Sequence, residues 1–128
     1  MMKMLLEKIK TKQATIAVIG LGYVGLPFAM ENAKVGYRVI GLDVQDGKVN
    51  MVNSGISYIS DISNEDLLNV VKGRYLKAST DYSKLKEVDC IIICVPTPLD
   101  KYMQPDITYL EDSVNEIAKY LHKEISLI

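Results

Sequence analysis

The sequence contains no tryptophan, one phenylalanine, one histidine and only two cysteines in 128 residues. Its apolar runs are far shorter than the about 20 residues that a membrane-spanning helix needs, which excludes such a helix. The N-terminal stretch MMKMLLEKIKTK has neither the apolar region nor the small-residue cleavage site of a signal peptide. With few cysteines and no leader, we expect an intracellular protein of the reducing cytoplasm.

An excess of charge of one sign is also lacking. The 15 basic and 16 acidic residues give a net charge of −1 and form no block of like charge. This balance gives no electrostatic basis for binding nucleic acid or an anionic membrane, and the scattered tyrosines provide no stacking platform. We therefore expect no nucleic-acid and no membrane partner. The length and the hydrophobic content of 48% predict one soluble domain with a sizeable core.

Residues that bind metals or act as nucleophiles are equally sparse. Cys90 and Cys94 are four positions apart in an apolar run, so they face the same side of a strand as buried, reduced thiols. A zinc site needs closely spaced ligands in a turn and a second pair elsewhere, and both are missing. His122 lies among lysine and glutamate, as a surface histidine does. We expect no metal site and no catalytic residue in this chain.

Strand-like and helix-like segments alternate along the chain, which predicts an α/β fold with a doubly wound parallel sheet. The expected strands cover 15–20, 38–43, 75–79 and 89–95, and the expected helices cover 23–35, 47–53, 64–73 and the segment after Asp106, with a helical arm from Leu5 to Ile9. The strand at 89–95 is apolar on both alternating faces, as a central strand is. The final EISLI begins another strand, from which we expect a chain truncated at its C-terminal end.

Capping residues predict where two of these helices begin. Asn64 is the expected cap of one helix, which Gly73 ends, and Asp106 is the expected cap of the last helix. The apolar face of that last helix is expected to comprise Leu110, Val114, Ile117 and Leu121.

Three glycines follow the first expected strand in the stretch AVIGLGYVGLPFA. Gly20, Gly22 and Gly25 form the pattern G-x-G-x-x-G, and an apolar helix follows, in which Pro27 is tolerable near the first turn. This context is typical of dinucleotide binding. Gly20 permits the tight turn, Gly22 lets the backbone approach a pyrophosphate, and Gly25 lets the helix pack closely on the strand. The alternative is that these glycines serve a tight turn alone.

An acidic residue ends the second expected strand, at Asp43 in VIGLDV, 23 positions after Gly20. A carboxylate there accepts hydrogen bonds from both hydroxyls of the adenosine ribose and repels a 2′-phosphate, which predicts NAD rather than NADP. FAD remains an alternative cofactor, and a solvated strand-end carboxylate is the alternative interpretation of Asp43. A P-loop is excluded because no Gly-Lys-Ser/Thr follows the glycines.

The segments GLGYVGLPFA, GLDV, IIICVPTPL and PDITYLE together resemble the N-terminal NAD-binding domain of the UDP-glucose/GDP-mannose dehydrogenase family, a Rossmann-type domain. The resemblance runs from about Thr15 to the end of the chain. VPTPL, the PD-x-x-YLE segment and SYISDIS resemble the UDP-N-acetylglucosamine 6-dehydrogenase branch most. Enzymes of this family oxidise the C6 alcohol of a nucleotide sugar to a carboxylate and consume two NAD in turn.

The resemblance also implies roles for particular residues. The backbone at Tyr23 and Val24 meets the pyrophosphate. Lys48 lies over the adenosine side of the cofactor, although a solvated helix lysine is an equal alternative. Pro96 and Thr97, in the VPTP turn, lie beside the cofactor.

The family's catalytic cysteine lies further downstream in a Gly-Gly-x-Cys context that this sequence lacks. We therefore expect residues 1–128 to be the NAD-binding domain alone, inactive without the substrate-binding and catalytic-cysteine domains. The resemblance implies that the full-length protein is an NAD-dependent UDP-sugar 6-dehydrogenase of polysaccharide biosynthesis, a homo-oligomer that takes a nucleotide-sugar substrate. The alternative is a free-standing module that senses NAD.

Overall fold

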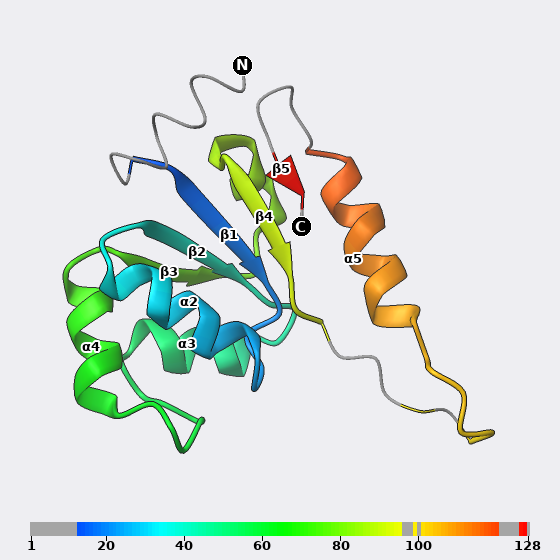
Figure 1. Cartoon of the computed structure of the whole chain (residues 1–128), viewed down its shortest axis with the longest axis horizontal. Coiled ribbons are helices and arrows are strands. Elements are labelled where there is room, and N and C mark those ends of the chain that lie inside the picture. Colours follow the sequence, from blue (N-terminus) through cyan, green and yellow to red (C-terminus); the bar gives the residue numbers. More distant parts are fainter. Residues whose placement is uncertain (1–12, 96–98, 100, 121–125, 128) are drawn as a thin grey trace.

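The computed structural model describes residues 13–95, 99, 101–120 and 126–127. Its centre is a five-stranded sheet in the order β3-β2-β1-β4-β5, in which all neighbouring strands are parallel (Figure 1). The strands are β1 (Thr15–Ile19), β2 (Arg38–Leu42), β3 (Leu76–Ser79), β4 (Cys90–Ile93) and β5 (Ser126–Leu127). The chain runs from β1 outward to β3 and then returns past β1 to β4, so the direction of winding reverses between β1 and β4.

Helices cover both faces of this sheet, which confirms the doubly wound α/β fold. One face carries α2 (Gly25–Lys34), α3 (Asp46–Asn53) and α4 (Asn64–Lys72), and the other carries the 3₁₀ helix η1 (Tyr82–Glu87) and α5 (Thr108–Ala118). No helix in the described residues is long and apolar enough to cross a membrane.

The first strand is buried on both faces because each face has its own hydrophobic cluster. Val18 packs with the side chains of α2, α3 and α4. Ala17 and Ile19 pack with Leu85 of η1 and Ile117 of α5. Successive side chains of a strand point to opposite faces, so the four positions of β1 that are enclosed in this way, 16–19, are all apolar.

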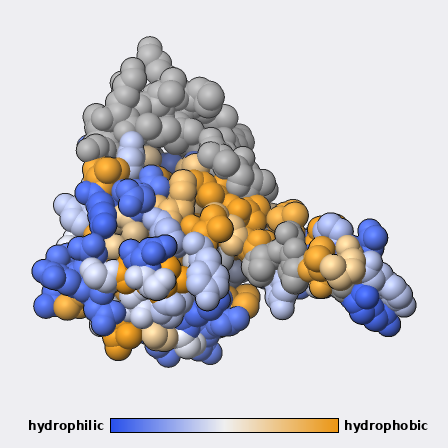
Figure 2. Space-filling view, turned by 60° about the horizontal axis from the view of Figure 1, so that its bottom comes forward, coloured by the Kyte–Doolittle hydropathy of each residue, from blue (hydrophilic) through white to orange (hydrophobic). Residues whose placement is uncertain are grey.

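The fourth strand is shorter and less covered than its sequence predicts. Ile91 is buried, but Ile92 and both cysteines are only half-buried. Cys90 and Cys94 pack against the same cluster, as their spacing predicts, and burial raises the pKa of each thiol. Figure 2 shows apolar surface gathered on the β4–α5 side of the molecule and hydrophilic surface on the α4 side. Because Cys90 and Cys94 are only half-buried, the expectation that both thiols are buried is wrong.

The expected cap of α4 is wrong by one residue. Ser63 is the N-cap, and its hydroxyl accepts a hydrogen bond from the Asp66 N–H at 3.1 Å. Asn64 is the first helical residue, and its Oδ1 accepts from the Ser57 N–H at 2.8 Å. Serine and asparagine cap helices almost equally well, so the preceding loop decides between them. Gly73 ends the helix as expected.

The last helix also differs from its expected pattern. Asp106 lies one residue before the N-cap position, and its carboxylate accepts from the Thr108 N–H at 2.9 Å. Ile117 is buried as expected, whereas Val114 is 42% exposed and Ser113 is buried in its place. The face of α5 that packs on the sheet is therefore rotated from the apolar stripe.

Several residues with a predicted role lie outside the described part of the chain. These are Pro96, Thr97, Leu121, His122 and the arm from Leu5 to Ile9.

The glycine-rich turn occupies the space between β1 and α2. The helix begins at Gly25 rather than at the expected Tyr23, which places Pro27 in its first turn, where a proline is tolerated. A Cβ on Gly25 would lie 1.7 Å from the Gly20 carbonyl oxygen, whereas a Cβ on Gly22 would meet nothing within 4 Å. Gly25 thus permits the close packing of helix and strand, and Gly22 leaves open space beside the turn.

These two glycines should respond differently to the same small substitution. Gly25→Ala forces a methyl group into backbone and should lower the free energy of unfolding by about 3 kcal/mol, the upper end of typical overpacking costs. Gly22→Ala should change it by less than about 1 kcal/mol. Urea unfolding of both variants measures the difference, and equal stabilities would contradict the packing role of Gly25.

Candidate functional site

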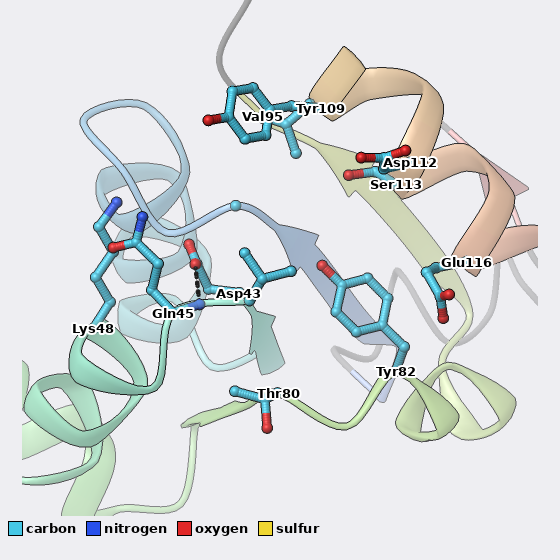
Figure 3. A pocket seen from close by; sticks show the side chains of 12 residues that line it. Asp43, Gln45, Lys48, Thr80, Tyr82, Val95, Tyr109, Asp112, Ser113 and Glu116 are labelled. Carbon is cyan, nitrogen blue, oxygen red and sulfur yellow. Dashed lines mark hydrogen bonds between the residues drawn. The ribbon is translucent and has the colours of Figure 1, made fainter.

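A cavity of about 480 Å³ lies at the carboxyl ends of the strands (Figure 3). Gly20, Asp43, Thr80 and Val95, which follow β1, β2, β3 and β4, form one side of it. Side chains of α3, η1 and α5 close the remaining sides. In open parallel sheets, ligands bind outside the carboxyl ends of the strands where the winding reverses, which is the position of this cavity.

The carboxylate of Asp43 is fixed by two backbone amides. Its Oδ2 accepts from the Leu21 N–H at 2.9 Å, and its Oδ1 accepts from the Gln45 N–H at 2.9 Å (Figure 3). Asp43 is only 8% exposed, so it is not a solvated strand-end residue. Each carboxylate oxygen has about two acceptor sites, so capacity remains for two hydroxyl donors from the cavity.

Leu21, between the first two glycines, is held at three points. Its N–H donates to Asp43, and its carbonyl accepts a hydrogen bond from the hydroxyl of Tyr58. Its side chain is fully buried against Gly41, where a Cβ would lie 2.6 Å from Leu21 Cδ2. Sequence reasoning missed Tyr58 and Gly41. A glycine inside a strand, such as Gly41, signals a close approach by another group and was the available clue.

The turn itself presents unused hydrogen-bond donors. In the described part of the chain, the N–H groups of Gly22, Tyr23 and Val24 donate to no protein acceptor. The side chains of Tyr23 and Val24 point into solvent, with Tyr23 84% exposed. No acidic residue lies in the first turn of α2 to offset the positive end of the helix dipole. Free amides at a helix start form a site for an anion such as phosphate.

One wall of the cavity carries a cation. Lys48 of α3 is half-buried, and its Nζ lies 6.0 Å from the centre of the Tyr58 ring. Among the described residues, Lys48 forms no ion pair. Its ammonium therefore remains available to a ligand, with the ring of Tyr58 as a weak cation–π support.

The opposite wall is acidic and aromatic. Asp112 and Glu116 of α5 line it together with Tyr82 and Tyr109 (Figure 3). Burial, followed by the charges of Asp43 and Glu116, raises the pKa of Tyr82. This wall can accept hydrogen bonds but disfavours a further anionic group beside its two carboxylates.

The structure brings most of the predicted residues together. Gly20, Asp43 and Lys48 line one cavity, and the turn through Gly22, Tyr23 and Val24 leads from it into α2. Gly25 lies beneath the turn, packed against Gly20.

Two further predictions concern the VPTP turn and metal binding. Pro96 and Thr97 are not described, but the preceding Val95 lines the cavity. No cluster of three or more metal-binding side chains occurs in the described ranges.

Comparison with known proteins identifies the domain. Residues 14–128 match the UDP-glucose/GDP-mannose dehydrogenase family, NAD binding domain. The chain is 37% identical over 111 residues to the UDP-N-acetyl-D-glucosamine 6-dehydrogenase of Salmonella typhi, covering 87% of this chain and 25% of that protein. It is 42% identical over 114 residues to the UDP-N-acetyl-D-mannosamine dehydrogenase of Escherichia coli K12, covering 86% of this chain and 26% of that protein.

Solved structures agree with this match. The GDP-mannose dehydrogenase of Pseudomonas aeruginosa superimposes with a TM-score of 0.81 at 30% identity, over 88% of this chain and 27% of that one. The UDP-D-ManNAc dehydrogenase of Pyrococcus horikoshii superimposes with a TM-score of 0.82 at 36% identity, over the same shares of the two chains. The chain spans about a quarter of the length of these relatives. It belongs to the UDP-glucose/GDP-mannose dehydrogenase family, of which it is the NAD-binding domain.

Proposed function

We propose that the cavity holds the adenosine half of NAD, with the ribose hydroxyls on Asp43. The observation that carries this proposal is the carboxylate of Asp43, which two amides hold at the cavity edge with acceptor capacity to spare. A vicinal diol offers two donors, so it matches a carboxylate with one free acceptor site on each oxygen. The family is an NAD-binding one, which sets the FAD alternative aside.

The pyrophosphate is proposed to lie on the glycine-rich turn. The N–H groups of Gly22, Tyr23 and Val24 are the unused donors there, and Gly22 leaves room for close approach. Lys48, which lines the cavity wall, is proposed to face the adenosine side of the cofactor. Pro96 and Thr97 follow Val95 at the end of β4 and are proposed to flank the cofactor from that side.

The whole protein is proposed to be an NAD-dependent nucleotide-sugar 6-dehydrogenase, with this chain as its cofactor domain. The chain spans about a quarter of its relatives, which supports further domains for substrate binding and catalysis. We propose a UDP-N-acetylhexosamine, UDP-N-acetylglucosamine in the first instance, as the substrate. NAD supplies the hydride acceptor, used twice per alcohol oxidised to a carboxylate. A cytoplasmic homo-oligomer is part of this proposal.

Neither cysteine of the described residues lines the cavity. Cys90 and Cys94 pack against the cluster on the α2 side of the sheet, and burial raises the pKa of both thiols. A raised pKa suppresses the reactive thiolate. An aldehyde intermediate has to be trapped by a nucleophile before a second hydride can leave. The chain's contribution is therefore to bind and orient the cofactor.

Asp43 should set both affinity and selectivity for the cofactor. The wild-type chain should bind NAD more tightly than NADP, because a 2′-phosphate would meet the carboxylate. Asp43→Ala should weaken NAD binding by roughly 1–3 kcal/mol, the scale of hydrogen bonds to charged groups. It should also reduce the difference between the NAD and NADP affinities. Titration calorimetry with both cofactors measures this.

The matched control for Asp43 is Asp61→Ala, which removes the same charge from an exposed loop. It should leave both affinities unchanged. Binding of NADP by the wild-type chain as tight as that of NAD, or tighter, would overturn the role given to Asp43.

Gly22→Val should remove cofactor binding without unfolding the domain. The added side chain enters the open space beside the turn, where the pyrophosphate is proposed to lie, and contacts no protein atom through its Cβ. Calorimetry with NAD should show no binding, and the thermal midpoint should shift by a few degrees at most. Normal NAD binding by this variant would show that the turn is structural only.

The chain alone should not turn over substrate. Incubation with NAD and UDP-N-acetylglucosamine should give no rise in NADH absorbance. The protein extended by its downstream reading frame should reduce two NAD per sugar. NADH formation by the 128-residue chain would contradict the proposal that this chain binds the cofactor and that catalysis requires further domains. A full reading frame that ends at Ile128 would favour a free-standing NAD-sensing module.

A further inference from the structure

The connection between α3 and α4, residues 54–63, reaches the glycine-rich turn through one side chain. Tyr58 is half-buried, and its hydroxyl donates to the Leu21 carbonyl across 37 positions of sequence. Burial, followed by the charge of Asp43, raises the pKa of this phenol, so the hydroxyl keeps its proton at neutral pH. The contact is therefore a neutral hydroxyl donor on a peptide carbonyl.

The segment that carries Tyr58 is itself held in place. The Ser57 N–H donates to Asn64 Oδ1 at 2.8 Å, at the start of α4. The Ser57 hydroxyl donates to the Ile59 carbonyl at 2.9 Å, and the Ile59 side chain is buried in the core. Tyr58 thus projects from a connection that is tied at both neighbouring residues.

The contact fixes the direction of a peptide that faces the cofactor. The Leu21 carbonyl and the Gly22 N–H belong to one peptide unit, and the structure has no cis peptide bond in its described part. In a planar trans peptide the C=O and N–H bonds point in opposite directions. Holding the carbonyl toward Tyr58 therefore aims the Gly22 N–H away from Tyr58. The preceding peptide is held separately, because the Leu21 N–H donates to Asp43.

Among the described residues, Tyr58 is the only hydrogen-bond partner of this peptide unit, whereas the residues on either side are held by the buried Leu21 side chain and by the Leu26 N–H, which donates to the Gly22 carbonyl at 3.1 Å. Gly22 has no side chain, and the space where a Cβ would lie is empty to 4 Å. Glycine samples more backbone conformations than any other residue, so an unrestrained Gly22 would present its N–H in several directions. The hydrogen bond from the Tyr58 hydroxyl restricts the orientation of the Gly22 N–H before any ligand binds.

We propose that Tyr58 is a positioning residue for NAD, which sets the orientation of the Leu21–Gly22 peptide and supports Lys48 with its ring. The inference rests on the proposed placement of the pyrophosphate at this turn. The ring lies 6.0 Å from Lys48 Nζ, so one side chain contacts two parts of the proposed site. A turn that is already oriented binds more tightly, because less conformational freedom is lost on binding.

Tyr58→Phe tests the proposal, because it keeps the ring beside Lys48 and removes only the hydroxyl. The dissociation constant for NAD, measured by titration calorimetry, should rise about fivefold to tenfold, the scale of one neutral hydrogen bond. The ratio of NADP to NAD affinity should stay constant, because Asp43 sets it. In ¹⁵N-labelled protein, the Gly22 amide resonance should move.

Tyr75→Phe is the matched control, because Tyr75 is exposed and its hydroxyl has no hydrogen bond among the described residues. It should leave the NAD affinity and the Gly22 resonance unchanged. Asn64→Ala provides a second route, since it releases the Ser57 N–H without touching Tyr58. This variant should also raise the dissociation constant for NAD.

The outcomes separate this inference from the proposed function. If Gly22→Val abolishes NAD binding while Tyr58→Phe binds NAD as the wild type does, the positioning role is wrong and the cofactor site stands. If Tyr58→Phe weakens NAD and shifts the cofactor ratio together, the residue is a general support of the pocket and the inference fails. If the wild-type chain binds no NAD, both proposals fail.

Discussion

The hydrogen bond from the Leu21 N–H to the Asp43 carboxylate is the contact on which the site depends. At 2.9 Å it joins the end of β1 to the end of β2, directly after the Gly20 N–H has donated to the Leu42 carbonyl at 2.7 Å. The sheet's hydrogen bonding thus continues into the glycine-rich turn. The same carboxylate accepts from the Gln45 N–H at the start of α3. One side chain therefore positions both the glycine-rich turn and the start of α3.

This contact can form only because the backbone is tightly packed around it. Gly25 lets α2 approach within contact of Gly20, and the missing side chain of Gly41 lets the Leu21 side chain pack directly against β2. Each glycine removes a Cβ where another group already lies. The N–H groups of Gly22, Tyr23 and Val24, in the turn held by these contacts, donate to no protein acceptor among the described residues. The proposed anion site at the turn therefore depends on this packing as well as on the helix dipole.

The sequence allowed the sheet, the close packing at Gly25 and the position of Asp43 at the end of β2 to be predicted, because each follows from local spacing. The 3₁₀ helix η1 was not expected, since a single short turn has no periodicity to detect. The cap at Ser63 and the buried Ser113 differ from expectation because tertiary contacts choose between near-equal local options. The contact between Tyr58 and Leu21 joins residues 37 positions apart, and periodicity carries no information on such pairs.

The most direct test of this account is a crystal structure of the chain with NAD. The account predicts the adenosine ribose within hydrogen-bond distance of both Asp43 oxygens and the pyrophosphate on the N–H groups of Gly22, Tyr23 and Val24. It also predicts that Tyr58 still donates to the Leu21 carbonyl, with the turn unchanged from its free form. An adenosine bound elsewhere, or a turn that reorients its Leu21–Gly22 peptide on binding, would contradict it.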